Sequence, residues 1–394
     1  MSGNSRGGRP VAVHGSRVAL LLLAVAVAGC GNSPAKPTAS HDRGFADATA
    51  TPSQMPAATP TVAWTPAHGH FSPTGSMLTS LSNPVATVLA DGRVLVTGSD
   101  PDSPAEIYDP VTETFSQTGT LVNGDTGNPG TLLRDGRVLI AGGSGTGASQ
   151  LYDPATGTFS ATGSMAQDRW GDVAVLLNDG RVLIAGGYDI GDAPIASAEV
   201  YDPTTGKFSR TGSMMVRRGS PTASLLPDGR VLILGGEDLK SDQRHLLATA
   251  EVYAPTTGKF TRAGDLPFPL EGATATLLRT GRVLVVGGQI DDAQGQTSAE
   301  LYNPKTGKFT LTGAMDRPRS GHTATLLPDG HVLVAGGPID TSAEIYDPAT
   351  GTFRQTGSMT QYRSWASAAL LRDGRVLLVG GSDGSSNSAE TYWP

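Results

Sequence analysis

The chain has 394 residues, of which 52 are glycine, 16% are charged and 6% are aromatic. This composition favours many short strands and tight turns over long helices. The net charge of -7 argues against nucleic acid as a partner, and it becomes more negative still without residues 1–29, which hold three arginines and no acid.

Residues 1–29 are expected to be a signal segment. The apolar run VALLLLAVAVAGC follows the arginines; it is long enough for a signal-peptide core and too short for a transmembrane helix. Its last four residues, Val27 to Cys30, resemble a bacterial lipobox, in which the cysteine is lipidated and becomes the mature amino terminus. The resemblance implies a membrane anchor at Cys30 and a place in the cell envelope on the extracytoplasmic side, at the surface or in the periplasm. The alternative is an ordinary signal peptide followed by an incidental cysteine.

Residues 30–63 are expected to be a disordered tether, because they are rich in Pro, Ala, Thr and Ser and show no apolar period. Cys30 is the single cysteine in the sequence, so no disulfide can form within one chain. Residues 64–394 then form the folded domain.

Within this domain one motif recurs seven times, for instance as DGRVLIAGG from Asp135 and again, letter for letter, from Asp179. An apolar run precedes each copy, and segments such as SAEIYDP and GTFSATGSM follow it. The pattern predicts four short strands per repeat. The DG pair is expected to form a two-residue hairpin turn with both residues at positive φ.

A glycine pair, a tyrosine and a further aromatic residue recur in register, as Gly142, Gly143, Tyr152 and Phe159 do in one copy. This pattern resembles the kelch repeat, although kelch repeats commonly have Trp where this chain has Phe. The resemblance implies an all-β fold, a seven-bladed kelch-type β-propeller like that of the galactose oxidase family. We expect the repeated tyrosines to be packing residues.

The ends of the domain predict how the ring closes. The sequence ends on SAETYWP, which reads as a third strand, and the domain begins with GHFSPTGSM, which reads as a fourth strand. We therefore expect an amino-terminal outer strand to complete the last blade, with Phe71 and its neighbours beside Tyr392. Such a strand would remove the exposed sheet edges.

Length variation between repeats is confined to the segment after the glycine pair. Three long segments fall in consecutive repeats, at 188–197, 237–249 and 289–298. Variation at one loop position indicates one variable face, which in repeat folds is usually the binding face.

Each inner strand is expected to begin on that face, and four of the seven begin with arginine. Cations, aromatic residues, an acid and a histidine would then surround the mouth, a set suited to an acidic sugar or a carboxylate peptide. In the other interpretation the arginines pack between blades or pair with backbone carbonyls. The candidate ligand-binding residues are Arg169, Trp170, Asp172, Arg218, Arg319, His322, Arg363 and Trp365.

We expect no metal, cofactor or assigned catalytic residue. Galactose oxidase relatives hold copper with Tyr and His and crosslink one Tyr to a Cys, whereas this domain has no cysteine after residue 30. After Phe71 only His245, His322 and His331 remain, too few for a multi-histidine site. The predicted function is a membrane-anchored binding module for a glycan or protein ligand. The alternative is a metal-free carbohydrate-active enzyme similar to the kelch-like sialic acid mutarotases.

Overall fold

The computed structural model describes residues 69–81, 83–98, 104–122, 130–143, 147–240, 243–290, 295–337, 340–381 and 386–394. The predicted signal segment, Cys30 and the tether lie outside the described residues. The chain divides into two units, and the second, Trp64–Pro394, holds every described strand. Within the described part of the chain, no helix is long and apolar enough to cross a membrane.

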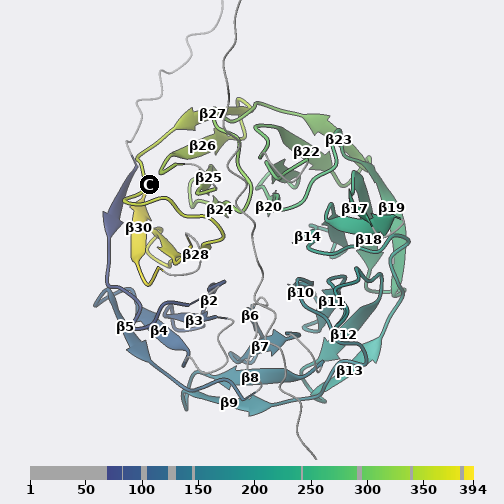
Figure 1. The fold of residues 1–394 in the computed structure, drawn as a ribbon, viewed down its shortest axis with the longest axis horizontal. Helices are drawn as coiled ribbons and strands as arrows, with labels where there is room; N and C mark the ends of the chain where they lie inside the picture. Colours follow the sequence, from purple (N-terminus) through teal and green to yellow (C-terminus); the bar gives the residue numbers. More distant parts are fainter. Residues whose placement is uncertain are drawn as a thin grey trace, which may run out of the picture. The chain divides into compact units, whose positions relative to one another are not determined.

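Seven four-stranded antiparallel sheets, the blades, form a ring (Figure 1). Neighbouring inner strands contact one another in the closed order β2, β6, β10, β14, β20, β24, β28 and back to β2. The predicted all-β fold with seven blades is therefore confirmed.

Blades 1 to 4 and one extra hairpin come first along the chain. Their strands, from the axis outward, are β2 (Val85–Val88), β3 (Val94–Thr97), β4 (Glu106–Asp109) and β5 (Thr114–Gln117) in blade 1; β6 (Gly130–Leu132), β7 (Val138–Ala141), β8 (Ser149–Asp153) and β9 (Thr158–Ala161) in blade 2; β10 (Val173–Leu176), β11 (Val182–Ala185), β12 (Ala198–Asp202) and β13 (Lys207–Arg210) in blade 3; β14 (Thr222–Leu225), β15 (Val231–Leu234), β18 (Thr249–Ala254) and β19 (Lys259–Asp265) in blade 4, with the separate hairpin β16 (Glu237–Lys240) and β17 (Gln243–Leu246).

Blades 5 to 7 complete the ring. Their strands are β20 (Thr274–Leu277), β21 (Val283–Val286), β22 (Ala299–Asn303) and β23 (Lys308–Leu311) in blade 5; β24 (Thr323–Leu326), β25 (Val332–Ala335), β26 (Ala343–Asp347) and β27 (Thr352–Gln355) in blade 6; β28 (Ser367–Leu370), β29 (Val376–Val379), β30 (Ala389–Trp393) and β1 (His70–Pro73) in blade 7.

The second strand of each blade is the part of the motif that reads VLIA or similar. All four of its residues are buried in every blade, because blades pack on both of its faces, and this burial explains why the motif lacks polar alternation. These strands supply much of the apolar core on each side of a blade.

The DG turn differs from the expected two-residue turn. In blade 2 the Gly136 amide donates to Leu133 O, and only Gly136, at φ 89°, takes the left-handed conformation. Asp135 is not among the residues with positive φ, and its carboxylate accepts the Arg137 amide at 3.1 Å. The connection is therefore a type I turn followed by a left-handed glycine.

Ring closure follows the prediction. Strand β1 pairs antiparallel with β30, and Phe71 lies opposite Tyr392 with ring centroids 4.9 Å apart. Residues from the two ends of the domain thus complete blade 7. The repeated tyrosines are buried as expected, and their hydroxyls tie blades together, as where Tyr346 Oη and Thr312 Oγ1 lie 2.9 Å apart.

Candidate binding site at the mouth of the ring

Inner strands begin on one face of the ring, and the loops that follow the glycine pairs meet them there. Isolated bridges join Trp170 to Tyr188 and Glu271 to Gln289, which places two of the long loops beside the starts of inner strands. The DG turns lie at the other ends of the same strands. We call the first face the mouth face.

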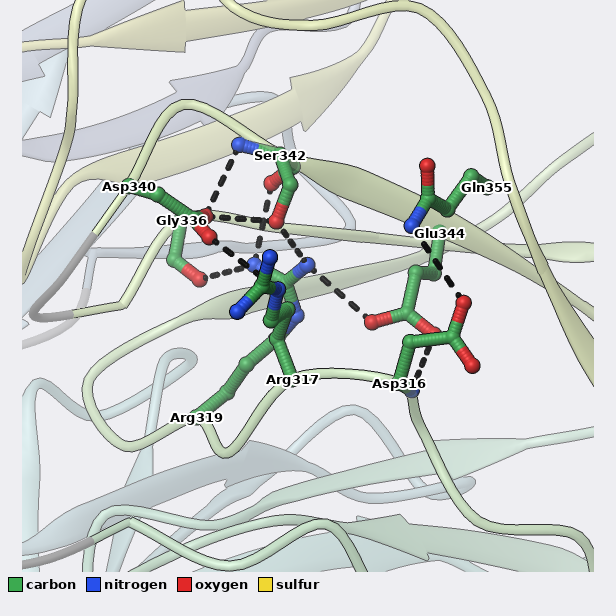
Figure 2. A network of polar contacts seen from close by, with 8 residues as sticks. All are labelled: Asp316, Arg317, Arg319, Gly336, Asp340, Ser342, Glu344 and Gln355. Carbon is green, nitrogen blue, oxygen red and sulfur yellow. Dashed lines mark hydrogen bonds and ion pairs between the residues drawn. The ribbon is translucent and has the colours of Figure 1, made fainter.

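The four arginines at the inner-strand starts lie inside their blades. Figure 2 shows the arrangement in blade 6, where Arg319 Nη1 donates to Gly336 O at 2.7 Å and to Ser342 O at 2.9 Å. Its Nη2 donates to Ser342 Oγ at 2.7 Å and to Glu344 Oε1 at 3.1 Å. The guanidinium is thus held by carbonyls of its own blade and by one carboxylate.

The same arrangement recurs in three other blades. Each arginine is almost fully buried and forms an ion pair with a glutamate on the third strand, Arg169 with Glu199 at 3.3 Å, Arg218 with Glu251 at 3.2 Å and Arg363 with Glu390 at 2.5 Å. The structure therefore favours the interpretation in which these arginines pair with backbone carbonyls, and it corrects the expectation that they present cations to a ligand. In each of these four blades a glutamate stands two residues before the repeated tyrosine, and this sequence signal could have identified the partners of the arginines.

A cavity of about 360 Å³ lies on the axis at the mouth face. One residue per described inner-strand start has positive φ and lines this cavity, and the six such residues are Asn83, Gly171, Ser220, Gly272, Gly321 and Trp365. Left-handed backbone is costly for residues with a side chain, most of all for a bulky one. The three non-glycine residues at this position therefore hold strained backbone conformations, which glycine would adopt without strain.

Trp365 is the most unusual of these residues. It holds φ at 58° and leaves 58% of its surface exposed, while its amide donates to Gly321 O at 2.8 Å. A Cβ built on Gly321 would lie 2.9 Å from the Trp365 ring, and one on Gly272 would lie 3.4 Å from it. The indole thus extends from blade 7 over the backbone of blades 6 and 5 and forms an aromatic platform at the mouth.

Asp172 and His322, both predicted from sequence, also line the cavity. Burial raises the pKa of the Asp172 carboxyl to about 7, against the opposing effects of Arg169 and of its own backbone amide, and no other residue forms a hydrogen bond with either carboxylate oxygen. Burial, with the nearby Arg319, lowers the pKa of His322 to about 3, so its imidazole is neutral at physiological pH. Its Nε2 lies 3.0 Å from Thr274 Oγ1.

Among the described residues that line the cavity there is no lysine or arginine. The lining offers an amide, hydroxyls, the Asp172 carboxyl, a neutral imidazole, backbone groups and an exposed indole. Such a set suits a neutral polar ligand with a flat or apolar face, rather than the anionic ligand expected from the arginines.

A wall of three long loops stands beside the cavity, and the sequence did not predict its contacts. Trp170 stacks on Tyr188 with ring centroids 4.4 Å apart, and Tyr188 Oη donates to Glu237 Oε1 at 2.8 Å. Arg244, from the β16–β17 hairpin, forms ion pairs with both Glu237 and Glu271. We call this set of contacts the wall network.

Glu271 extends the network to the third loop, because its carboxylate accepts Gln289 Nε2 at 3.0 Å. The wall network therefore links the loops of blades 3, 4 and 5. Of the predicted residues, the fold gathers Asp172, His322 and Trp365 around one cavity, places Trp170 on the wall and turns the side chains of the four arginines into their blades. No group of three or more metal-ligating side chains occurs among the described residues.

Comparisons with known proteins agree with this architecture. The Kelch motif matches residues 169–215. No curated protein matches the chain. Among solved structures, a fungal alcohol oxidase of the AA5 family, determined in complex with copper, is similar at a TM-score of 0.71 and 19% identity, over 83% of this chain and 76% of that one. This similarity concerns the fold.

Proposed function

We propose that this β-propeller, whose residues 169–215 match the Kelch motif, is an extracytoplasmic, lipid-anchored binding module whose mouth takes a neutral glycan. The observation that carries the proposal is Trp365, a bulky side chain held in left-handed backbone where three other described blades use glycine. Strained residues persist mainly where function requires them. An indole at a concave site binds the apolar face of a sugar ring, while hydroxyl and amide groups beside it bind the sugar hydroxyls.

The lining supports a neutral rather than an acidic sugar. The nearest cations, such as Arg319 and Arg169, are engaged with glutamates and carbonyls inside their blades. His322 is uncharged at neutral pH. Asp172, beside the cavity, would repel an anion whenever it is ionised.

The anchoring part of the proposal rests on the sequence VAGC and on the position of Cys30. Several acyl chains on one residue give firm attachment, since each buried CH₂ contributes about 0.8 kcal/mol. The Pro-rich residues 30–63 would separate the propeller from the membrane surface.

A screen of the purified protein against an array of neutral and acidic glycans tests the proposal, with calorimetry to measure affinity for each positive glycan. Trp365→Gly should weaken binding of a neutral glycan at least about tenfold, equivalent to 1.4 kcal/mol. Val111→Ser, at a 90% exposed site beside the DG turns, is the matched control and should bind like the parent. Binding confined to acidic glycans, or unchanged affinity in Trp365→Gly, would contradict the proposal.

One observation favours a second candidate, a metal-free sugar isomerase. The Asp172 carboxyl, with its pKa raised to about 7 by burial, is poised to exchange a proton near neutral pH beside the cavity. An isomerase would speed the exchange of sugar anomers at trace protein concentration, which NMR exchange spectroscopy measures directly. A binding module would leave the exchange rate unchanged, and Asp172→Asn is the variant that should abolish any acceleration.

A further inference from the structure

The third strand of each blade carries an acidic or amide side chain near its start, and in six blades this side chain accepts a backbone amide. The donating residue lies in the segment that runs from the outer strand of the preceding blade to the next inner strand. The amide nitrogen and the side-chain oxygen are 2.8 to 2.9 Å apart. The donor and acceptor pairs are Leu78 and Glu106, Val122 and Gln150, Ala166 and Glu199, Met215 and Glu251, Asp316 and Glu344, and Thr360 and Glu390.

Blade 5 lacks this donor. Pro267 stands at the register position of the donating residue, and proline has no backbone N–H. The second donor is also missing, because Leu270 stands where blades 3, 4, 6 and 7 have an arginine. Glu300 is the glutamate of this blade; it is 0% exposed, and neither carboxylate oxygen accepts a backbone amide or a guanidinium. The Ser298 hydroxyl lies close enough to favour its charged form.

Blade 1 shows that a leucine in place of the arginine does not by itself leave the glutamate without donors. Leu81 also replaces the arginine there, but Glu106 accepts the amides of Leu78 and Thr79 and the Thr79 hydroxyl, at 2.8 to 2.9 Å. Its negative charge is therefore well solvated by the protein. Only blade 5 among the described blades combines a buried glutamate with the loss of both kinds of donor.

In blade 5 the sequence and the strand register place oxygen acceptors at the positions that surround the buried arginines in other blades. In blade 6 the guanidinium of Arg319 binds Gly336 O, Ser342 O, Ser342 Oγ and Glu344. The equivalent atoms in blade 5 are Gly287 O, Ser298 O, Ser298 Oγ and the Glu300 carboxylate. We call these four groups the blade 5 oxygen cage. Leucine has no polar atom that could bind them.

We propose that the blade 5 oxygen cage binds a small monovalent cation, of the size of sodium, potassium or ammonium. Burial raises the pKa of the Glu300 carboxyl to about 7, because an isolated buried carboxylate is strongly disfavoured, and either a proton or a bound cation neutralises it. Carboxylate, carbonyl and hydroxyl oxygens are the ligands that hard cations prefer. One formal negative charge, with no second acid in the cage, favours a monovalent ion over a divalent one.

The site would tie a variable loop to the body of its blade. Ser298 ends the long loop 289–298 and directly precedes β22, which carries Glu300. The Ser298 hydroxyl donates to Gln296 Oε1 at 3.1 Å, and Gln296 forms a bridge to Arg319 in the next blade. A cation in the cage would therefore hold the base of this loop against blades 5 and 6.

Thermal unfolding of the purified protein tests the proposal, in chloride salts of sodium, potassium, ammonium and choline at one pH and one ionic strength. Choline is the reference, because it is too large for the cage. At a hundredfold excess over the dissociation constant, the preferred ion should raise Tm by about 4 °C relative to choline.

Two variants should lose this ion-specific shift. Glu300→Gln removes the charge, and Leu270→Arg supplies the guanidinium that four other blades use, so the second variant should also fold without help from an ion. Glu106→Gln in blade 1 is the matched control and should keep the shift. Equal Tm values for the parent in all four salts, or a shift that survives in both Glu300→Gln and Leu270→Arg, would overturn the proposal.

Discussion

Arg319 and Glu344 form an ion pair inside blade 6, with Nη2 and Oε1 3.1 Å apart and both side chains at most 2% exposed. Because the pair is fully buried, removing one partner leaves an uncompensated charge. Arg319→Met should therefore lower the free energy of unfolding by about 3–5 kcal/mol, measured by denaturant titration.

The double variant Arg319→Met, Glu344→Leu should recover part of that loss, since no isolated charge remains. Glycan affinity per folded molecule should stay the same in both variants. If Arg319→Met is as stable as the parent but binds ligand weakly, Arg319 contacts the ligand and its structural role is contradicted.

Because strand β1 completes blade 7, we expect an amino-terminal truncation to destabilise the protein when it removes this strand. Removing residues 1–77 deletes β1 and its pairing with β30, which leaves β30 as an exposed sheet edge. This variant should unfold at a markedly lower temperature than the parent or aggregate. Removing residues 1–60 leaves β1 intact and should have little effect on Tm. Equal melting temperatures for the two truncations would show that the ring does not depend on this strand.

Asp172 predicts a pH dependence of stability. Its folded-state pKa, about 7, lies above the ordinary value of 3.8, so folding favours the protonated form. The contribution to stability is complete below pH 4 and is lost as the pH rises to about 7. Asp172→Asn should remove this decline, by up to about 4 kcal/mol, in denaturant titrations across that range. An unchanged profile in Asp172→Asn would assign the decline to other groups.

We expect His322 to make stability depend on pH in the opposite direction, with a loss of stability at low pH. Its folded-state pKa, about 3, lies below the ordinary value of 6.5, so the unfolded chain binds a proton first as the pH falls. The stability that it contributes is present above pH 6.5 and is lost toward pH 3. His322→Gln should therefore flatten the acid side of the stability profile without changing the decline toward pH 7 that is assigned to Asp172.

We expect replacement of Trp365 by glycine to raise stability and to weaken ligand binding. Trp365→Gly relieves left-handed strain at φ 58°, and we expect it to raise the free energy of unfolding by roughly 1 kcal/mol. The same substitution should weaken glycan binding. Trp393→Gly, which removes a ring stacked on His70 outside the mouth, is the control and should not increase stability.

Cys30 predicts the attachment of lipid. Cys30→Ser should abolish incorporation of labelled palmitate and move the protein from the detergent phase to the aqueous phase, because the sulfur that would carry the lipid is gone. Ser33→Ala, in the same segment, is the control for labelling. A serine variant that still labels and partitions like the parent would contradict the lipobox interpretation.

The repeat determined much of the fold in advance. Seven copies of DGRVLIAGG-like sequence predict seven blades, and the split pattern at the two ends predicts that β1 completes blade 7. The site was predicted less well. The sequence located Asp172, His322 and Trp365, but it could not separate these residues from Arg319 a few positions away, which turns into its blade because Glu344 and two carbonyls receive it there.

The sequence by itself determined the number of blades, the closing strand and the face where loop length varies, because strand period and turn residues act through local hydrogen bonding and burial. The tertiary structure decided which side chains reach the mouth and which charges are left without partners. Trp365 extends over the mouth from a residue with left-handed backbone. Glu300 has neither a backbone-amide nor a guanidinium donor, because Pro267 and Leu270 stand at the two donor positions about thirty residues earlier in the chain. Such contacts depend on where the fold places residues that are distant in sequence, and strand period and turn residues do not determine this.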